Sequence, residues 1–533
     1  MKSKASSLPL FQPVSDRYRR VLPLQLGTGC YVMYSHSESM EVADERFFRK
    51  IFLYDDEYTS CGVVVVGNAT AKRYVLVGAL TAWRSLTHFV VRLRGAVLDT
   101  IEVRQEDIPD DGSVPPEELV VLEGDNWCEL LRRYARLAAE KNGVAPMKAA
   151  ASITGYLCWY YYYDTVSEAD FLENAEYMYQ ARRNGVYPAE LIQLDDGYQA
   201  CQGDWLELAP TWTTSLKEIA QGIAAHGHTP GIWVMPFVAA TTSRLFREHP
   251  QWFVKDLATG EPKVFNGWAQ PPNHQWLTLD ATNPEVIAHF KTLFRTLHDW
   301  GFRYFKLDGM GFALQAGLRH DTKATPVAAY RAGLQAIREA IPDDFILGCN
   351  APYTPTLGFC NANRVSRDIA ADWEMVRDGW KETIARFWMY DTWYRCDPDV
   401  VVVREELGNL TPGEARFSAL TGVVTGVAIT SDKLPFLSPV RLAMLTTAAK
   451  FHLQDAIPDD WPENEWPEVI HGTINGRHAA AVFNWRDTPR SYTLEQLGFP
   501  PNRQLKDLMG AVRTVWGGLA LPPHDAALIV ERV

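Results

Sequence analysis

The segment YFKLDGMG, residues 304–311, carries a lysine and an aspartate two positions apart within an apolar run. Successive side chains of a strand point to opposite faces, so Lys306 and Asp308 would point the same way. An ion pair buried in a core rarely adds stability for its own sake. The pair is therefore either a structural bridge or part of a pocket. In a pocket, the charge of Lys306 would keep Asp308 ionised, as a nucleophile must be.

Polar side chains also end the other predicted strands. They follow LIQL and FILG, lie along ANRVSRD, and follow WYRC and VAITS; in chain order they are Asp195, Asp196, Cys349, Asn350, Arg364, Asp368, Asp397 and Asp432. An aspartate at the end of a strand often caps the next helix, which accounts for one or two of these residues. Carboxylates at five of eight strand ends indicate a functional site instead.

The elements that would position these residues alternate along the chain. From Ile153 to about residue 450, eight strand-like runs are each followed by a helical stretch. This alternation predicts a central (β/α)8 TIM barrel. Functional side chains of such barrels gather at the C-terminal ends of the strands. We therefore expect the polar residues named above to converge on one face.

Convergent carboxylates suit glycoside cleavage. One carboxylate attacks the anomeric carbon, while a second protonates the leaving oxygen. A carboxylate cage could instead hold a divalent cation. Lys306 and Arg364 are already placed to neutralise the carboxylate charges, so a metal site is the weaker hypothesis. We expect neither a metal nor an organic cofactor.

Aromatic residues lie close to several of these strand ends. The chain has 18 Trp, 22 Tyr and 23 Phe, and their faces can pack a core or carry a sugar ring. Trp159, in LCWYYYYD, and Trp233, in GIWVMPF, would lie near the ends of the first and third strands. Asp204 and Trp205, in QGDW, would shape the pocket or a neighbouring subsite from the loop after Asp196.

The segments on either side of the barrel have a different pattern of apolar residues. Short apolar runs broken by turns predict an N-terminal β-sandwich in residues 1–145, with a linker helix over 126–144. Residues 146–455 would form the catalytic barrel, and residues 456–533 a small C-terminal antiparallel β-sandwich. The sequence thus predicts a multidomain α/β protein.

The composition of the chain disfavours some classes of binding partner and indicates a cellular compartment. The net charge of −13 disfavours a nucleic acid partner, and the absence of an apolar run of about 18 residues disfavours a membrane span. The eight cysteines lack metal-ligand spacing, and the first 20 residues lack the apolar stretch of a signal peptide. We predict a cytoplasmic protein with free thiols.

The motifs, taken in order, resemble those of α-galactosidases. LIQLDDGYQACQGDW is similar to the double-aspartate strand of glycoside hydrolase families 27 and 36, and YFKLDGM is similar to their nucleophile strand. ILGCNAPYTPTLGFCNANRVSRDIAADW resembles the segment with the acid/base aspartate, and WYRCDPDVVVV resembles the DPD strand. The match covers most of residues 150–450, and the flanking sandwiches suit family 36 of the same clan.

This resemblance implies a role for each matched residue. Asp308 would be the nucleophile and Asp368 the acid/base, with their carboxyl groups about 5–5.5 Å apart. Arg364 and Cys349, followed by Asn350, would face the 2-position of the sugar. Asp195, Asp196 and Lys306 would bind the hydroxyls that distinguish galactose, while Trp159 and Trp233 would line the pocket. The implied activity is retaining hydrolysis of terminal α-D-galactosides, with a small carbohydrate as the substrate.

Two departures from the family pattern keep alternatives open. Leu307 stands where an aromatic residue is common, and NAPYTPTLG replaces a glycine-rich run near the 2-position. An α-N-acetylgalactosaminidase and a galactosyltransferase resembling raffinose and stachyose synthases are therefore alternatives. A carbohydrate-binding protein without catalysis is an alternative from another class. The resemblance also leaves open whether the protein forms a homo-oligomer.

Overall fold

The computed structural model describes residues 6–7, 20–22, 57–68, 73–94, 97–105, 115–145, 152–458, 460, 466–501, 503–509, 513–515 and 517–532. Cys30 and the apolar run around it lie outside these residues. The statements below concern the described part of the chain.

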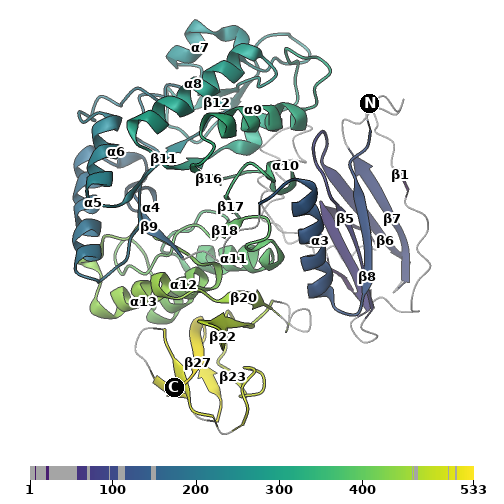
Figure 1. The fold of residues 1–533 in the computed structure, drawn as a ribbon, viewed down its shortest axis with the longest axis vertical. Helices are drawn as coiled ribbons and strands as arrows, with labels where there is room; N and C mark the ends of the chain where they lie inside the picture. The colour runs from purple at the N-terminus through teal and green to yellow at the C-terminus, as the bar shows by residue number, and fades with distance from the viewer. Residues whose placement is uncertain are drawn as a thin grey trace.

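Eight parallel strands form the barrel that the sequence predicts (Figure 1). In chain order they are β9 (Ile153–Leu157), β10 (Leu191–Leu194), β11 (Thr229–Val234), β15 (Tyr304–Leu307), β16 (Phe345–Gly348), β17 (Ala362–Arg364), β18 (Arg395–Asp397) and β19 (Val427–Thr430). Hydrogen-bonded neighbours follow the order β18-β17-β16-β15-β11-β10-β9-β19. The amide of Val401, just past β18, donates to the carbonyl of Ile429 in β19 at 2.8 Å, which brings the two ends of the sheet together.

Helices cover the outside of the barrel. The longer ones are α5 (Glu168–Arg183), α6 (Leu216–Ala225), α8 (Pro284–Trp300), α9 (Pro326–Ala340), α11 (Trp373–Ile384), α12 (Pro412–Thr425) and α13 (Pro439–Lys450). Capping boxes begin three of them, at Ser167, Ser215 and Thr411, because these hydroxyls satisfy amides that the first turn leaves unpaired. Gly301 ends α8 in the left-handed conformation that glycine adopts easily.

Short helical turns follow several barrel strands and shape the C-terminal end of the barrel. They are α4 (Trp159–Tyr162), η2 (Tyr163–Thr165), η4 (Met310–Leu314), α10 (Tyr353–Thr356) and η6 (Leu434–Phe436). A further turn, η5 (Phe387–Met389), lies between α11 and β18 and leads into a strand.

An insertion separates β11 from α8. It contains β12 (Val238–Ala240), α7 (Arg244–Glu248), η3 (Pro250–Trp252), β13 (Val264–Asn266) and β14 (Gln275–Thr278). Its strands form an antiparallel sheet in the order β12-β14-β13. The loop between β13 and β14 reaches the cavity described below.

Two four-stranded antiparallel sheets precede the barrel, with orders β1-β7-β6-β3 and β2-β4-β5-β8. Their strands are β1 (Ser6–Ser7), β2 (Arg20–Leu22), β3 (Glu57–Cys61), β4 (Val63–Asn68), β5 (Arg73–Ala79), β6 (Thr87–Arg94), β7 (Val97–Gln105) and β8 (Leu119–Gly124). The predicted linker helix is α3 (Trp127–Lys141), which lies between these sheets and the barrel (Figure 1). The indole of Trp393 in the barrel donates to the carbonyl of Ala135 in α3 at 2.9 Å.

A six-stranded antiparallel sheet, in the order β20-β21-β22-β27-β24-β25, and a two-stranded sheet of β23 and β26 end the chain. The strands are β20 (Gln454–Ile457), β21 (Val469–Ile474), β22 (Arg477–Asn484), β23 (Arg490–Tyr492), β24 (Leu505–Asp507), β25 (Arg513–Val515), β26 (Leu519–Leu521) and β27 (Asp525–Glu531). A separate apolar core, including Val482, Tyr492 and Leu521, lies between the two sheets. The antiparallel sheets on both sides of the barrel confirm the predicted flanking β-domains. The domain boundaries at residues 145 and 455 stay a prediction.

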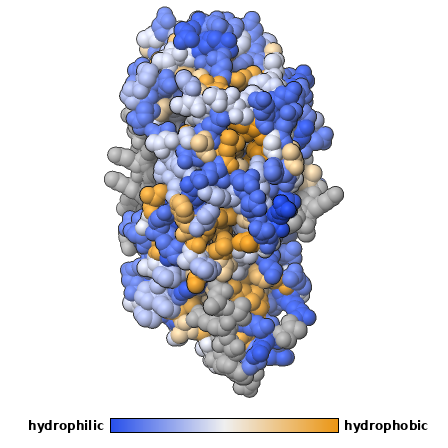
Figure 2. Space-filling model, turned by 90° about the vertical axis from the view of Figure 1, so that its left-hand side faces the viewer, coloured by the Kyte–Doolittle hydropathy of each residue, from blue (hydrophilic) through white to orange (hydrophobic). Residues whose placement is uncertain are grey.

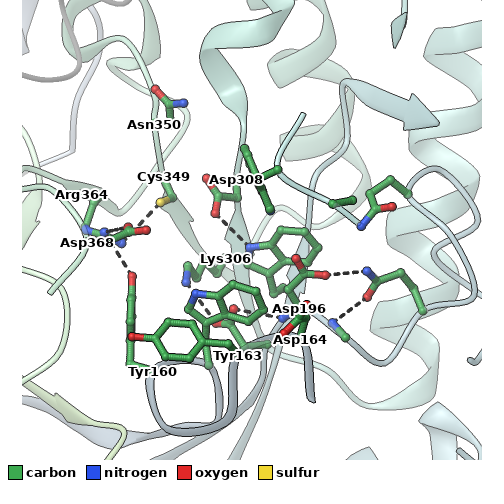
Figure 3. A pocket seen from close by; sticks show the side chains of 18 of the residues that line it. Tyr160, Tyr163, Asp164, Asp196, Lys306, Asp308, Cys349, Asn350, Arg364 and Asp368 are labelled. Atoms are coloured by element: carbon green, nitrogen blue, oxygen red, sulfur yellow. Dashed lines mark hydrogen bonds and ion pairs between the residues drawn. The ribbon is translucent and has the colours of Figure 1, made fainter. Parts of the chain in front are cut away.

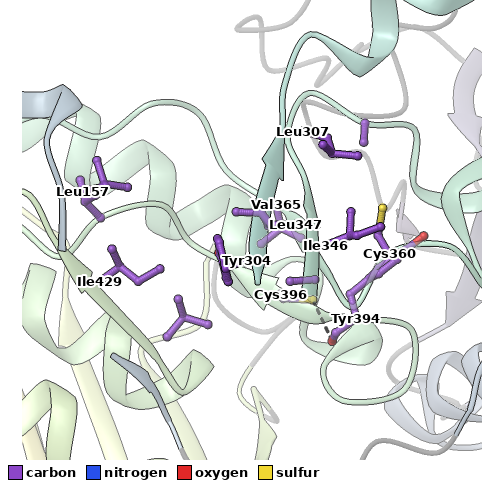
Figure 4. Close-up of a cluster of buried hydrophobic side chains, with 14 of the residues drawn as sticks. Leu157, Tyr304, Leu307, Ile346, Leu347, Cys360, Val365, Tyr394, Cys396 and Ile429 are labelled. Carbon is purple, nitrogen blue, oxygen red and sulfur yellow. Dashed lines mark hydrogen bonds between the residues drawn. The ribbon is translucent and has the colours of Figure 1, made fainter. Parts of the chain in front are cut away.

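The interior of the barrel is packed with apolar side chains from most of its strands. Leu157, Tyr304, Leu347 and Ile429 belong to this buried cluster (Figure 4). The helices on the side of α5, α6 and α13 present a mostly hydrophilic surface interrupted by apolar patches (Figure 2). The packed barrel is the rigid support on which the strand-end residues stand.

Candidate active site

A cavity of about 1010 Å³ contains most of the predicted site residues. Ten of the twelve line its wall: Trp159, Asp195, Asp196, Trp233, Lys306, Asp308, Cys349, Asn350, Arg364 and Asp368. They come from the C-terminal ends of barrel strands and from the loops that follow, as expected for this fold. In Figure 3, Asp308 lies across the cavity from Tyr160 and Tyr163, with Arg364 and Asp368 on one side and Asp196 on the other.

Lys306 and Asp195 form a buried ion pair at the bottom of the cavity. The Nζ atom of Lys306 lies 3.0 Å from Oδ2 of Asp195, and the two side chains are only 4% and 2% exposed. The side-chain amide of Gln193 donates to the same oxygen at 2.5 Å. Burial alone would lower the pKa of Lys306, but the negative charge of Asp195 and of further neighbours raises that pKa above its ordinary value. Lys306 is therefore a charged donor at neutral pH.

Asp308 is half-buried at the end of β15, and two donors fix its carboxylate. Oδ2 accepts a hydrogen bond of 3.0 Å from the indole of Trp233, and Oδ1 accepts one of 2.7 Å from the amide of Gly309. Gly309 has φ +58°, and a Cβ atom there would lie 2.6 Å from the sulfur of Met235. A glycine at this position thus allows the amide to be turned toward the carboxylate.

Asp196 lies on the opposite side of the cavity from Arg364 (Figure 3). Its Oδ1 accepts a hydrogen bond of 2.5 Å from the side-chain amide of Gln199. Burial, together with the negative charges of Asp195 and Asp308, raises the pKa of Asp196 to about 6. Asp195, Asp196 and Asp308 therefore line the same cavity as the cation Lys306.

Arg364 is buried and shared by two carboxylates. Its Nη1 lies 3.1 Å from Oδ1 of Asp399, whose side chain is 2% exposed, and its Nη2 forms an ion pair with Asp368, whose side chain is 66% exposed. The same guanidinium donates to the hydroxyl of Tyr160 at 3.3 Å and to the sulfur of Cys349 at 3.5 Å. These contacts fix Arg364 beside the side chains that the sequence places near the sugar 2-position.

The two carboxylates that share Arg364 respond to it in opposite ways. The position of Asp368 inside the cavity opposes its ionisation, but the charges of Arg364 and Lys306 hold the pKa of this carboxyl below its usual value. Burial dominates at Asp399 and raises its pKa to about 7 despite Arg364. The exposed carboxylate thus stays charged while the buried one titrates near neutral pH.

Two predicted residues, Asp204 and Trp205, do not line the cavity wall, and their contact with a sugar stays a prediction. Trp205 is buried and packs edge-to-face against Trp233, with ring centroids 5.6 Å apart. Asp204 accepts hydrogen bonds from the amides of Arg244 and Leu245 at 2.8 and 3.0 Å. Trp205 therefore supports a wall residue from behind, and Asp204 caps the first turn of α7.

Among the carboxylates near the later strand ends, three stabilise the fold and do not line the cavity. Asp372 caps α11 by accepting from the amide of Met375 at 3.1 Å. Asp397 is buried and accepts from the amide of Asp399 at 3.0 Å. Asp432 pairs with Arg404 at 2.8 Å. Asp368 is the member of this group that lines the cavity.

The sequence alone did not single out four further residues of the site. Tyr160, Tyr163 and Trp268 line the cavity, and Asp399 holds Arg364 from behind. Tyr160 and Tyr163 adjoin Trp159 in the run WYYYY, and Asp399 ends the DPD motif, so each had a signal nearby. Trp268 lies in the insertion, where no periodic pattern marks it.

Among the described residues, no group of three or more His, Cys, Asp or Glu side chains is arranged to hold a metal ion. Within the same residues, no helix is both long and apolar enough to span a membrane.

Part of the chain is similar in sequence to known glycosidases. Residues 174–345 match the family model described as Melibiase. A Flavonifractor plautii protein named A type blood alpha-D-galactosamine galactosaminidase is 27% identical over 171 residues, which are 30% of this chain and 16% of that protein. An Escherichia coli α-galactosidase is 27% identical over 184 residues, which are 32% of this chain and 24% of that protein. The matched stretches thus span about a quarter or less of these curated relatives.

A solved structure extends the similarity beyond that stretch. The α-galactosidase TtGalA from Thermus thermophilus, in complex with stachyose, is 25% identical, with a TM-score of 0.61. The match covers 73% of this chain and 80% of that one.

A (β/α)8 barrel with several carboxylates in a cavity at its C-terminal end has the architecture of a glycoside hydrolase. Residues 174–345 are similar to a melibiase domain, and the chain is similar to α-galactosidases in sequence and in fold. The matched segment contains Asp195, Asp196, Lys306 and Asp308, whereas Asp368 lies beyond it. The resemblance drawn from the sequence is confirmed, and the roles of individual residues stay a prediction.

Proposed function

We propose that the protein is a retaining exo-α-galactosidase that hydrolyses terminal α-D-galactosyl residues. The observation that carries this proposal is the shared cavity. It combines Asp308 and Asp368 with the buried Lys306–Asp195 pair and with Asp196. The stachyose complex of the Thermus thermophilus relative supports an oligosaccharide with terminal galactose as the substrate class.

The reaction would proceed by double displacement. An oxygen of Asp308 attacks the anomeric carbon, and the bond from that carbon to the leaving oxygen breaks as Asp368 gives its proton to that oxygen. A water molecule then attacks the same carbon and releases Asp308, while Asp368 takes a proton from the water. The two donors on Asp308, Trp233 and Gly309, aim the carboxylate before the attack.

Asp368 must gain a proton before it can act as the acid. In the free protein its ion pair with Arg364 favours the charged form. A sugar hydroxyl that accepts hydrogen bonds from Arg364 would weaken this pair and raise the pKa of Asp368. Because its side chain is two-thirds exposed, solvent can supply the proton.

Selection for galactose would come from the carboxylates on the floor and side of the cavity. Asp195 and Asp196 can accept hydrogen bonds from the sugar hydroxyls, and Lys306 can donate to them. A sugar with another stereochemistry at carbon 4 would leave at least one of these buried groups unpaired. Such a loss discriminates strongly between substrates.

The 2-position is the place where a related activity could arise. The name of the Flavonifractor plautii relative specifies galactosamine, which carries an amine at this position. In this chain the buried cation Arg364, with Cys349 beside it, is the predicted contact. A positive charge there disfavours an ammonium group, so we propose a 2-hydroxyl sugar.

A panel of p-nitrophenyl glycosides tests the proposal with purified protein. It contains the α-galactoside, α-N-acetylgalactosaminide, α-galactosaminide, α-glucoside and β-galactoside. We expect hydrolysis of the α-galactoside, with α-galactose as the first-formed product by NMR. Preference for a 2-substituted sugar would overturn the assignment at Arg364 and Cys349. No hydrolysis of any compound would overturn the proposed function.

A further inference from the structure

The cavity is larger than a pocket for one sugar. Its volume of about 1010 Å³ lies at the top of the range of roughly 300–1,000 Å³ for drug-sized ligands, and one hexose is smaller than these. The residues assigned to galactose, among them Asp195, Lys306 and Arg364, are buried. Trp268 lines the same cavity but is 44% exposed. The cavity thus extends from a polar floor to an aromatic rim.

Trp268 lies beside the predicted galactose pocket. Burial raises the pKa of Asp196 to about 6, and hydrogen bonding from the side chains of Gln199 and Trp268 acts against this rise. The indole is therefore close enough to influence a carboxylate of the pocket floor. A group attached to a sugar in that pocket would meet this part of the rim.

The loop that carries Trp268 is firmly held. Trp268 packs edge-to-face on the buried ring of Trp276, with centroids 4.6 Å apart and planes at 79°. The indole of Trp276 donates to the carbonyl of Asn273 in the same loop at 2.7 Å. A Cβ atom at Gly267 would lie 2.1 Å from the ring of Trp276, so only glycine fits beside it. The fold thus presents a large, rigid and half-open aromatic face to the cavity.

The charges around the rim disfavour an anionic ligand. Asp164 and Asp368 are carboxylates of the cavity wall. Arg367 also lines the wall, but its guanidinium lies 2.8 Å from Glu382 and 3.4 Å from Asp378. These two carboxylates offset its charge, so the rim disfavours an anionic group.

We infer that Trp268 forms the subsite for the leaving group and that this group is a neutral sugar ring stacked on the indole face. An aromatic face offers a large apolar area that matches the C–H side of a pyranose. This inference rests on the proposed function, because the galactose pocket next to the subsite sets the position of the ring.

Comparing two substrates isolates the subsite. Melibiose has a glucose leaving group, and α-galactosyl fluoride has a leaving group without a ring. We expect the ratio of kcat/KM for melibiose to kcat/KM for the fluoride to fall about tenfold in Trp268→Ala. Trp268→Phe keeps a ring and should recover most of this ratio. Phe436→Ala removes an aromatic side chain that is 52% exposed and outside the cavity wall, and should keep the wild-type ratio.

The outcomes separate the subsite from the activity. Active wild-type protein and an unchanged ratio in Trp268→Ala would overturn the subsite alone. Equal losses on both substrates would place Trp268 in the galactose pocket and would also overturn the inference. If Trp268→Ala does not fold, Trp268→Leu takes its place as the variant without a ring. A wild-type ratio in both Trp268→Phe and Trp268→Leu would then overturn the subsite. Wild-type protein inactive on both substrates would overturn the proposed function and the subsite with it.

Discussion

At the scale of single residues, the two reacting carboxylates can be told apart by the leaving group. Asp308→Ala should lose at least about 10³-fold in kcat on every substrate, because no covalent intermediate forms. Asp368→Ala should lose about 10²–10⁴-fold on melibiose but much less on an aryl galactoside with a strongly acidic phenol, which departs without a proton. Steady-state kinetics on the two substrates check this. Equal losses in the two variants would contradict the roles assigned here.

Binding provides the control for these variants. Galactose should still raise the melting temperature of Asp308→Ala, because Asp195, Asp196 and Lys306 remain in place. Loss of this stabilisation would mean that the substitution had damaged the pocket instead of the reaction.

Asp399 makes a contribution to stability that depends on pH. Its pKa in the folded protein is about 7, above the unfolded value of about 3.9, so the folded state holds a proton that the unfolded state has lost. The free energy of unfolding should therefore fall as pH rises from about 4 to about 7, and this contribution should be constant above pH 7. In Asp399→Asn the free energy of unfolding should fall less steeply with pH, by up to about 1.4 kcal/mol per pH unit.

Urea unfolding of both proteins at several pH values measures this difference. Asp196 also has a raised pKa, so the wild-type slope contains its contribution as well, and Asp196→Asn is the matched comparison. Parallel slopes for wild type and Asp399→Asn would show that Asp399 is ionised in the folded protein throughout this range.

At the scale of elements, the turn after β15 decides how Asp308 is held. Gly309→Ala places a methyl group in the left-handed region and within 2.6 Å of the sulfur of Met235. We expect a loss of about 2 kcal/mol in unfolding free energy and a large fall in kcat, since the amide that binds Asp308 would shift. Gly185→Ala is the control, because Gly185 has φ +67° but open space around its Cβ position. It should cost about 1 kcal/mol and keep kcat; equal kcat in both variants would contradict the argument.

The sequence predicts elements best where one periodic pattern sets them. Several barrel strands are apolar runs followed by a polar residue, so Asp195 and Asp308 could be placed at strand ends without coordinates. Asp204 lies in the loop after the double aspartate and caps α7, because its carboxylate accepts hydrogen bonds from amides at the start of that helix. Trp268 could not be predicted, since its exposure depends on how the loop after β13 packs on Trp276.

At the scale of the whole molecule, the C-terminal sheet is joined to the barrel by a largely buried ion pair. Arg416 of α12 donates two hydrogen bonds, of 2.8 and 2.6 Å, to Asp525 of β27, whose side chain is 2% exposed. Beside it, His524 stacks on Trp373 at the start of α11, with centroids 4.3 Å apart. The domains therefore meet through specific contacts on the helix layer, outside the cavity.

Removal of Arg416 tests how much this interface stabilises the molecule. Arg416→Ala leaves the buried Asp525 without a cation, and we expect a loss of about 2 kcal/mol, less than for a fully buried pair because Arg416 is 24% exposed. Arg503→Ala breaks the exposed Arg503–Glu531 pair in the same C-terminal domain and should cost less than about 1 kcal/mol. Urea unfolding followed by tryptophan fluorescence compares the two. Equal shifts would contradict a stabilising interface, whereas a large shift with unchanged kcat for Arg416→Ala would show that the C-terminal sheet supports the barrel without shaping the reaction.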